Sequence, residues 1–338
     1  MKKILLITIL AICLFSLTVI AQEKSSLDEQ LKSYLHQDFF KLNILLQSEG
    51  RFSFEDDDFQ GGRTFSAANA RVSLRGNLDG GFFYRIYIDA APQPGLLDAY
   101  AGYKANDGFS LAVGAMKPRQ TLDYIPNPAE HNFVDRATMT GLLVGSREIG
   151  VSATGDIGNL YYYAGLFNGN RLNSNNNNKF YGIGRLQYTI HDLLPGYVQL
   201  AVSGSHGNSE GTRSGSRGPW LRGNRTIVGT DVEIESNGFY FAAEYLRGEL
   251  ETVDLPEINE IISGYYLTGG YQIMRNTMLF CRWQSWSYKE QDTMERKVTL
   301  GINIDFTDYV GLVLNVDAYM PDEGDNRHGA SFIFQVLF

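Results

Sequence analysis

Short stretches in which every second residue is apolar recur along almost the whole chain. In 298–306 apolar side chains alternate with Thr, Gly, Asn and Asp, and similar alternation runs through 42–47, 71–75 and 84–89. Successive side chains of a β-strand point to opposite faces, so each stretch predicts a strand with one apolar and one polar face. After the first 21 residues, no apolar run approaches the ~18 residues that a membrane-spanning helix needs. The pattern therefore predicts an all-β protein.

The number of these stretches predicts how the strands close. Sixteen segments alternate in this way, over 39–52, 69–79, 82–90, 96–104, 109–116, 147–155, 159–168, 179–190, 197–206, 226–236, 238–249, 263–274, 276–288, 296–306, 309–319 and 329–338. Most are near the ~9–11 residues that a tilted strand needs to cross a bilayer. An even strand number is typical of single-chain transmembrane barrels.

The links between the segments alternate in length. Long links such as 117–146 and 207–225 follow odd-numbered segments, whereas short ones such as 80–81 and 307–308 follow even-numbered ones. Long extracellular loops and short periplasmic turns are typical of outer-membrane barrels. We therefore predict a 16-stranded antiparallel transmembrane β-barrel in the outer membrane of a Gram-negative bacterium, surrounded by outer-membrane lipid.

Both ends of the chain carry export signals. Residues 1–21 combine a positive start, an apolar core and a small residue before Gln22, which predicts a secretory signal peptide. The last strand alternates and ends on Phe338, a pattern that we expect the outer-membrane assembly machinery to read. The alternative for this strand is an ordinary sheet edge, although soluble proteins usually blunt an apolar edge.

The expected domains follow from these signals. A periplasmic leader spans 22–38 and the barrel spans 39–338. Apolar residues in 27–35 have helical spacing, so the leader is either a short helix or a poorly ordered segment.

Composition excludes several classes of function. The formal net charge of −9 argues against a nucleic-acid partner, and Cys281 is the only cysteine after the signal peptide, so no disulfide or multi-cysteine metal site can form within the mature chain. We find no HExxH, G-x-S-x-G or P-loop pattern. A phospholipase-like pair would have to use His206 with Ser203 or Ser205. We therefore expect no enzyme activity, no catalytic residue, no cofactor and no metal.

The polar face of each predicted strand should line the lumen. By this parity the first half of the barrel presents many bases, whereas the second half is rich in carboxylates, so the two walls should create a transverse field. Alternatively, these charges pair with one another across the lumen. Our candidates for pore-lining, anion-binding residues are Arg71, Arg75, Arg85, Lys104, Lys117, Arg119, Arg136 and Arg185.

The longest link, 117–146, contains three prolines and charges of both signs. A connection of this length without regular structure usually has a function. We expect it to fold into the lumen and constrict a channel that sixteen strands would otherwise leave open. The alternatives are a loop that covers the outside or contacts a neighbouring subunit.

Several segments resemble the phosphate-selective porin O and P family. They are LDAYAGYK (97–104), VGAMKP (113–118), NFVDRA (132–137) and SREIGV (146–151), in that order. The resemblance implies a trimer of 16-stranded pores for passive uptake of small solutes. It also implies an arginine ladder, to which Arg71, Arg75 and Arg85 would belong, with Lys117 at the start of the constriction loop.

These observations lead to three hypotheses. The first is a porin through which small hydrophilic solutes, anionic or neutral, diffuse with a mild anion preference. The second is a channel selective for phosphate or polyphosphate. The third is a non-conducting barrel that acts as an adhesion or assembly scaffold.

Overall fold

The computed structural model describes residues 35–338 except 56, 92–93 and 192. The predicted signal peptide and almost all of the leader, with its predicted helix, lie outside these residues. Two compact units are separated at Gln37, and the two-residue strand β1 (His36–Gln37) belongs to the first. Within the described residues no helix has the length and apolar character needed to cross a membrane.

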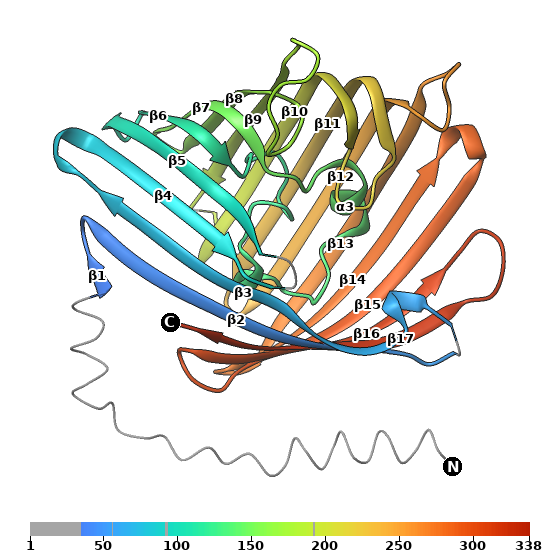
Figure 1. The fold of residues 1–338 in the computed structure, drawn as a ribbon. Coiled ribbons are helices and arrows are strands. Elements are labelled where there is room, and N and C mark those ends of the chain that lie inside the picture. Colours follow the sequence, from blue (N-terminus) through green and yellow to red (C-terminus); the bar gives the residue numbers. More distant parts are fainter. Residues whose placement is uncertain (1–34, 56, 92–93, 192) are drawn as a thin grey trace. The chain divides into compact units, whose positions relative to one another are not determined.

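The second unit, Asp38–Phe338, is a closed antiparallel barrel (Figure 1). Each strand pairs with the next along the chain, and the last pairs with β2. This confirms the predicted fold of sixteen strands. They are β2 (Phe40–Ser53), β3 (Arg63–Asn77), β4 (Phe82–Asp89), β5 (Gly95–Asn106), β6 (Phe109–Met116), β7 (Glu148–Ile157), β8 (Leu160–Phe167), β9 (Tyr181–Ile190), β10 (Gly196–Arg213), β11 (Trp220–Ser236), β12 (Phe239–Thr252), β13 (Glu260–Met274), β14 (Thr277–Tyr288), β15 (Thr293–Asp305), β16 (Val310–Met320) and β17 (Arg327–Leu337).

Helical turns occur only in the links of the described barrel. The α-helix α3 (Thr138–Leu143) lies in the longest link, and four 3-10 turns are η1 (Phe59–Gly61), η2 (Asp79–Gly81), η3 (Pro128–Glu130) and η4 (Lys289–Gln291). The shortest links use residues that tolerate positive φ. Asn237 and Gly238, which join β11 to β12, have φ of 48° and 81°, as the tightest hairpin turns require.

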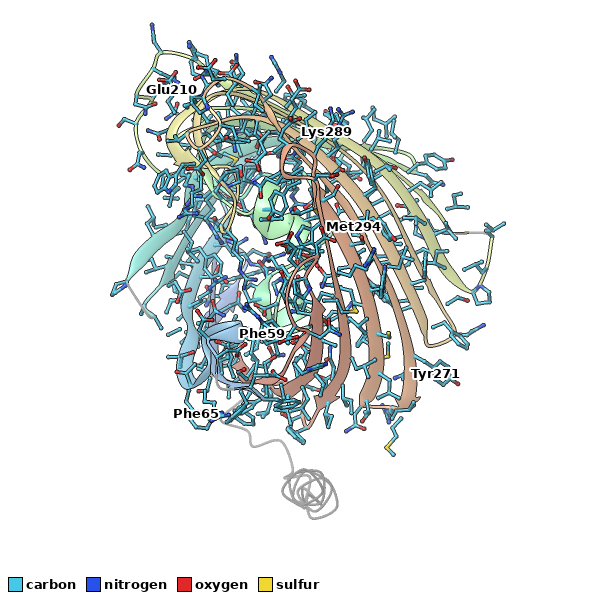
Figure 2. The ribbon with its side chains drawn as sticks, turned by 90° about the vertical axis from the view of Figure 1, so that its right-hand side faces the viewer. Phe59, Phe65, Glu210, Tyr271, Lys289 and Met294 are labelled. Atoms are coloured by element: carbon cyan, nitrogen blue, oxygen red, sulfur yellow. The ribbon has the colours of Figure 1, made fainter. Side chains whose placement is uncertain are left out.

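One predicted link was wrong over most of its length. The polar segment 207–225 was expected to be a loop, but β10 and β11 continue through most of it and leave only 214–219 between them. Glu210 lies in this extension, at the upper end of the molecule in Figure 2. Strands that extend beyond the bilayer have no apolar face, so the alternation that predicts a strand is lost there.

The outer face of the barrel is apolar, as a lipid-facing surface must be. Phe65, Val113 and Leu200 are among the exposed apolar residues, at 72%, 57% and 47%. Aromatic side chains gather near the short turns, where Phe239 and Tyr271 have ring centroids 4.5 Å apart. Tyr271 lies near the lower rim in Figure 2. Aromatic girdles at the membrane interface are typical of such barrels.

The inner face is polar yet largely buried, because the longest link fills much of the lumen. Asp98, Asp231, Glu244 and Asp317 are all at least nine-tenths buried. Where α3 meets the wall the contact is apolar instead, and Leu142 and Leu143 form one cluster with Leu246 and other wall residues. This cluster holds α3 inside the ring of strands (Figure 1).

Candidate functional site

The link between β6 and β7, residues 117–147, crosses the inside of the barrel. We call it the lumen loop. The backbone N–H of Leu122 donates to Glu244 on β12 at 2.8 Å, and that of Thr138 donates to Gln284 on β14 at 2.7 Å. The N–H of Val134 donates to Asn315 on β16 at 2.6 Å. Since β6 and β7 lie on the other side of the barrel from β12 and β14, these bonds require the loop to span the lumen.

Further contacts fix the loop on β2, on the link between β10 and β11, and on β12. Arg51 on β2 forms two hydrogen bonds with Asp135, at 2.9 and 3.0 Å, and Arg217 reaches the same carboxylate at 3.1 Å. On β12, Gly248 has no side chain where Leu143 of α3 packs; a Cβ there would lie 2.5 Å from Leu143 Cδ2. The wall is thus shaped to receive α3.

Three cavities lie around the lumen loop. The acidic cavity, of about 520 Å³, lies towards the short turns and includes Glu233, Glu235 and Asp305 in its lining. The aromatic cavity, of about 370 Å³, also lies towards the short turns, against β4 to β8. The outer cavity, of about 310 Å³, lies on the other side of the loop and is lined in part by Arg71 and Arg217.

Neighbouring cavities share some of their lining residues. Lys117 lines both the aromatic and the outer cavity. Arg136, His131 and Asp135 line both the acidic and the outer cavity. A solute moving from the outer cavity towards the short turns therefore passes either Lys117 or the group around Arg136.

We call the wall formed by β3 and β4, together with Arg147 beside it, the basic wall. Three arginines of the basic wall surround one tyrosine. The guanidinium carbons of Arg71, Arg85 and Arg147 lie 5.6, 4.7 and 5.8 Å from the ring centroid of Tyr87. A cation within about 6 Å of a ring is attracted to its face. Two carboxylates compensate part of this charge: Asp89 accepts from Arg71 at 2.8 Å, and Asp98 accepts from Arg147 at 2.7 Å.

Lys117 and Arg136 meet on the lumen loop itself. Lys117 Nζ donates to the carbonyls of Ile125 and Pro126 at 3.1 and 2.8 Å, and Arg136 Nη2 donates to the same Pro126 carbonyl at 2.8 Å. Both cations lie over the ring of Tyr124. Burial, with the charges of Arg136 and then Arg147, lowers the pKa of Lys117 to about 6.

More bases continue the basic wall towards the short turns. Arg75 lies opposite Arg85 on one side and Lys41 on the other in the strand register. Arg119 is exposed in the aromatic cavity, with its guanidinium 6.0 Å from the ring centroid of Tyr161. Neither Arg75 nor Arg119 has a carboxylate within ion-pairing distance among the described residues.

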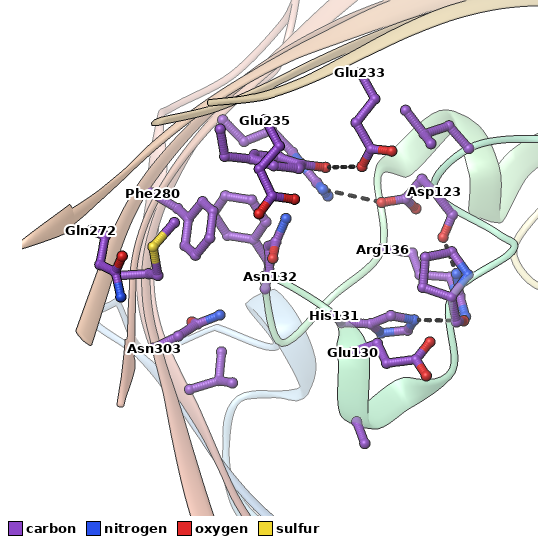
Figure 3. A pocket seen from close by; sticks show the side chains of 18 of the residues that line it. Asp123, Glu130, His131, Asn132, Arg136, Glu233, Glu235, Gln272, Phe280 and Asn303 are labelled. Atoms are coloured by element: carbon purple, nitrogen blue, oxygen red, sulfur yellow. Dashed lines mark hydrogen bonds and ion pairs between the residues drawn. The ribbon is translucent and has the colours of Figure 1, made fainter. Parts of the chain in front are cut away.

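The opposite wall is acidic, as Figure 3 shows. Glu233 and Glu235 line the acidic cavity, and Tyr240 donates to Glu233 at 3.0 Å. His131, on the loop side, lines the same cavity, with its Nε2 3.3 Å from the carbonyl oxygen of Pro126. Burial and then the neighbouring Arg136 lower the pKa of His131 to about 3. The imidazole is therefore neutral at physiological pH, and the two walls differ in charge as the sequence predicts.

Two of the candidate residues lie apart from this basic wall. Arg185 is 2% exposed and donates two hydrogen bonds, of 2.6 and 2.8 Å, to Asp231. Its charge is therefore neutralised inside the wall. Lys104 lies beside a short turn and pairs with Asp107 at 2.7 Å. The remaining six candidates line the basic wall or the lumen loop.

Several residues of the site were missed from the sequence. Arg147 has outward parity if β7 is extended back through it, but β7 begins at Glu148 and Arg147 turns towards Asp98. Tyr87 and Tyr124 were not selected because an aromatic residue carries no charge signal. Their role as platforms appears only once the strands place cations around them.

The serine–histidine combination in the middle of β10 does not assemble. His206 is exposed and bonds Thr226, whereas Ser205 has the opposite parity, is buried and bonds Tyr181 and Gln120. In the described residues, no group of three or more His, Cys, Asp and Glu side chains is arranged to hold a metal ion.

Comparison with solved structures finds the same fold. The anion-selective porin from Comamonas acidovorans matches with a TM-score of 0.69 and 12% identity, covering 88% of this chain and 99% of that chain. OmpT of Vibrio cholerae matches with a TM-score of 0.66 and 12% identity, over 88% and 97% of the two chains. The channel DcaP of Acinetobacter baumannii matches with a TM-score of 0.62 and 12% identity, over the same fractions.

Comparison of sequences identifies the family. None of the curated proteins matches this chain. The family model for phosphate-selective porin O and P matches residues 40–219, which is more than half of the chain and includes the lumen loop and most of the basic wall. The protein is thus an outer-membrane channel of a Gram-negative bacterium and belongs to the phosphate-selective porin O and P family.

Proposed function

We propose that this channel is a water-filled porin through which small hydrophilic solutes diffuse passively, with a preference for anions. The observation that carries the proposal is the charge around the lumen loop. Seven bases, Arg71, Arg75, Arg85, Lys117, Arg119, Arg136 and Arg147, outnumber the carboxylates beside them, which are Asp89 and Asp98 on the wall and Asp123, Glu130 and Asp135 on the lumen loop. Cations in a low-dielectric throat concentrate anions there.

The lumen loop would act as the constriction of this porin. Its hydrogen bonds to β12, β14 and β16 and its ion pair with Arg51 hold it across the lumen. Sixteen strands without such a loop leave a wide aqueous channel. Because Lys117 lies between two cavities, we infer that it lies on the route that anions take.

The acidic wall argues for a mild preference rather than strict selection of phosphate. Glu233, Glu235 and Asp305 line a larger cavity that shares Arg136 and His131 with the outer cavity. Cations would find a favourable potential there, so the pore as a whole would conduct both signs. Conduction of both cations and anions distinguishes the proposed porin from a dedicated phosphate channel.

Further parts of the proposal concern assembly. We propose that residues 1–21 are removed as a signal peptide, that 22–38 is a periplasmic leader, and that the barrel forms a homotrimer. The terminal strand would be read by the assembly machinery. It ends in mutual backbone hydrogen bonds between Phe338 and Ile44, of 2.7 and 3.0 Å.

Planar-bilayer recording tests the proposal. Purified protein should insert with stepwise conductance, and in a salt gradient the reversal potential should have the sign of anion permeation. Deleting 119–144 should raise the conductance several-fold, because the loop no longer occupies the lumen. As a control, deleting 322–325, a shorter segment outside the lumen loop, should leave it unchanged. A silent barrel would contradict the proposal and favour a scaffold, and a cation-selective current would contradict the anion preference.

A further inference from the structure

The aromatic cavity is unusual among the three in what lines it. Four aromatic rings, those of Phe83, Tyr100, Tyr161 and Tyr163, share its lining with the bases Arg85, Lys117 and Arg119. Its volume of about 370 Å³ lies at the lower end of the range of small-molecule sites, about 300–1,000 Å³. A bare oxyanion needs cations and hydrogen-bond donors but no aromatic surface.

The register of the strands explains how the rings converge. Tyr161 and Tyr163 are two residues apart on β8, so both point inward. Phe83 and Tyr100 come from β4 and β5 and pack edge to face, with centroids 6.4 Å apart and planes at 80°. The rings on β4 and β5 and those on β8 line the same cavity, with β6 and β7 between them in the barrel wall.

Polar atoms in this cavity lack partners. Tyr161 Oη and Tyr163 Oη are buried and make no hydrogen bond with the described residues, whereas Arg85 Nε lies 3.6 Å from Asp98. Tyr163 is only 4% exposed. A buried donor without a partner costs free energy, so such groups mark places where a water molecule or a ligand completes the bonding.

The positive charge in the cavity is also incompletely balanced. Asp98 is the only carboxylate in its lining, and it already accepts from Arg147 at 2.7 Å and lies 3.6 Å from Arg85. Arg119, in contrast, is exposed towards the cavity and has no acidic partner in the described part of the chain. An anionic group entering the cavity would therefore find Arg119 available and a ring of Tyr161 beside it.

We infer that the aromatic cavity is a binding subsite, on the periplasmic side of the lumen loop, for anions that carry a planar ring, such as aryl phosphates or aromatic carboxylates. The anionic group would lie at Arg119 and Lys117, and the ring would stack among Tyr161, Tyr163 and Phe83. The inference rests on the proposed anion-conducting function and narrows it to a class of solute. Aromatic stacking adds a contribution that an inorganic anion cannot gain.

Block of chloride current in a planar bilayer tests the inference. Phenyl phosphate, inorganic phosphate and the neutral ring compound phenol are added in turn to each chamber. In the wild-type channel phenyl phosphate should block at concentrations about ten-fold lower than inorganic phosphate, a ratio in the range that ring contacts supply. Phenol should not block, because it lacks the charge.

Two variants and one control separate the parts of the site. Y161L should bring the ratio between the two phosphates close to one. R119Q should weaken block by both phosphates at least several-fold, a result that does not depend on how Y161L folds. Y188L is the control, because Tyr188 is 48% exposed on the outer face of the neighbouring β9 and should keep the wild-type ratio.

The outcomes distinguish this inference from the proposed function. Equal block by the two phosphates in the wild-type channel, or an unchanged ratio in Y161L, would overturn the ring subsite while leaving the anion-conducting porin in place. The absence of any anion-selective current would overturn the proposed function itself.

Discussion

The pH dependence of ion selectivity is the sharpest test of the basic wall, because one residue with a shifted pKa lies between two cavities. Burial and the charges of Arg136 and Arg147 lower the pKa of Lys117 to about 6. A lysine with a lowered pKa is charged below that value and neutral above it. Lys117 is therefore mostly neutral at pH 8 and mostly charged at pH 5, and the throat gains a positive charge as the pH falls.

The size of the effect follows from Coulomb's law. An ammonium about 4 Å from a passing anion stabilises it by about 1 kcal/mol at the dielectric constant of water and by about 4 kcal/mol at an effective dielectric constant of 20. The lower figure corresponds to about a five-fold change in anion occupancy. We expect the anion-to-cation permeability ratio, measured from the reversal potential in a KCl gradient, to rise at least five-fold from pH 8 to pH 5.

Two variants assign this step to Lys117. K117Q removes the charge. Its permeability ratio should change with pH only as much as the other titrating groups of the lumen contribute. K117R keeps a guanidinium that stays charged at both pH values, so its anion preference should be high throughout. If K117Q shows the same pH step as the wild-type channel, Lys117 does not control anion passage and the reasoning fails.

Three other substitutions test the contacts that shape the lumen. D231N removes the carboxylate that holds the buried Arg185 and should lower the free energy of unfolding by about 3–5 kcal/mol, measured by urea titration in detergent. An effect below about 1 kcal/mol would contradict a buried ion pair. D135N removes the carboxylate that Arg51 and Arg217 share. We expect the lumen loop to become more mobile and the open-channel current to fluctuate more. Unchanged current fluctuations would show that other contacts hold the loop. G248V places a side chain where Leu143 packs and should increase cleavage within 138–143 by added protease, with no increase if α3 can shift aside.

The barrel itself could be predicted from the sequence, because one face of each strand contacts lipid. That contact forces the alternation seen in 298–306, and the structure places 298–305 in β15 as expected. The strand ends were less predictable. β10 and β11 extend beyond the lipid, where no apolar face is needed, and the sequence there has the composition of a loop.

The site was predictable in its charges but not in its pairings. Parity on a strand identifies Arg75 and Arg185 equally as inward-facing, yet Arg75 lies opposite Arg85 and Lys41, whereas Arg185 is held by Asp231. Which base is neutralised depends on the neighbouring strands and on the path of the lumen loop. Neither is encoded in the spacing of residues along one strand.

The seam between β17 and β2 has a consequence for how the chain folds. It joins residues from the two ends of the barrel, with Leu337 opposite Leu45 and Gly329 opposite Ser53. Without these pairs the barrel would be an open sheet with two unpaired edges, and such edges pair readily with other chains. Contacts between residues so distant in sequence also form slowly. The nine residue pairs of this seam are thus the contacts that remove both edges and, with them, the route to pairing with another chain.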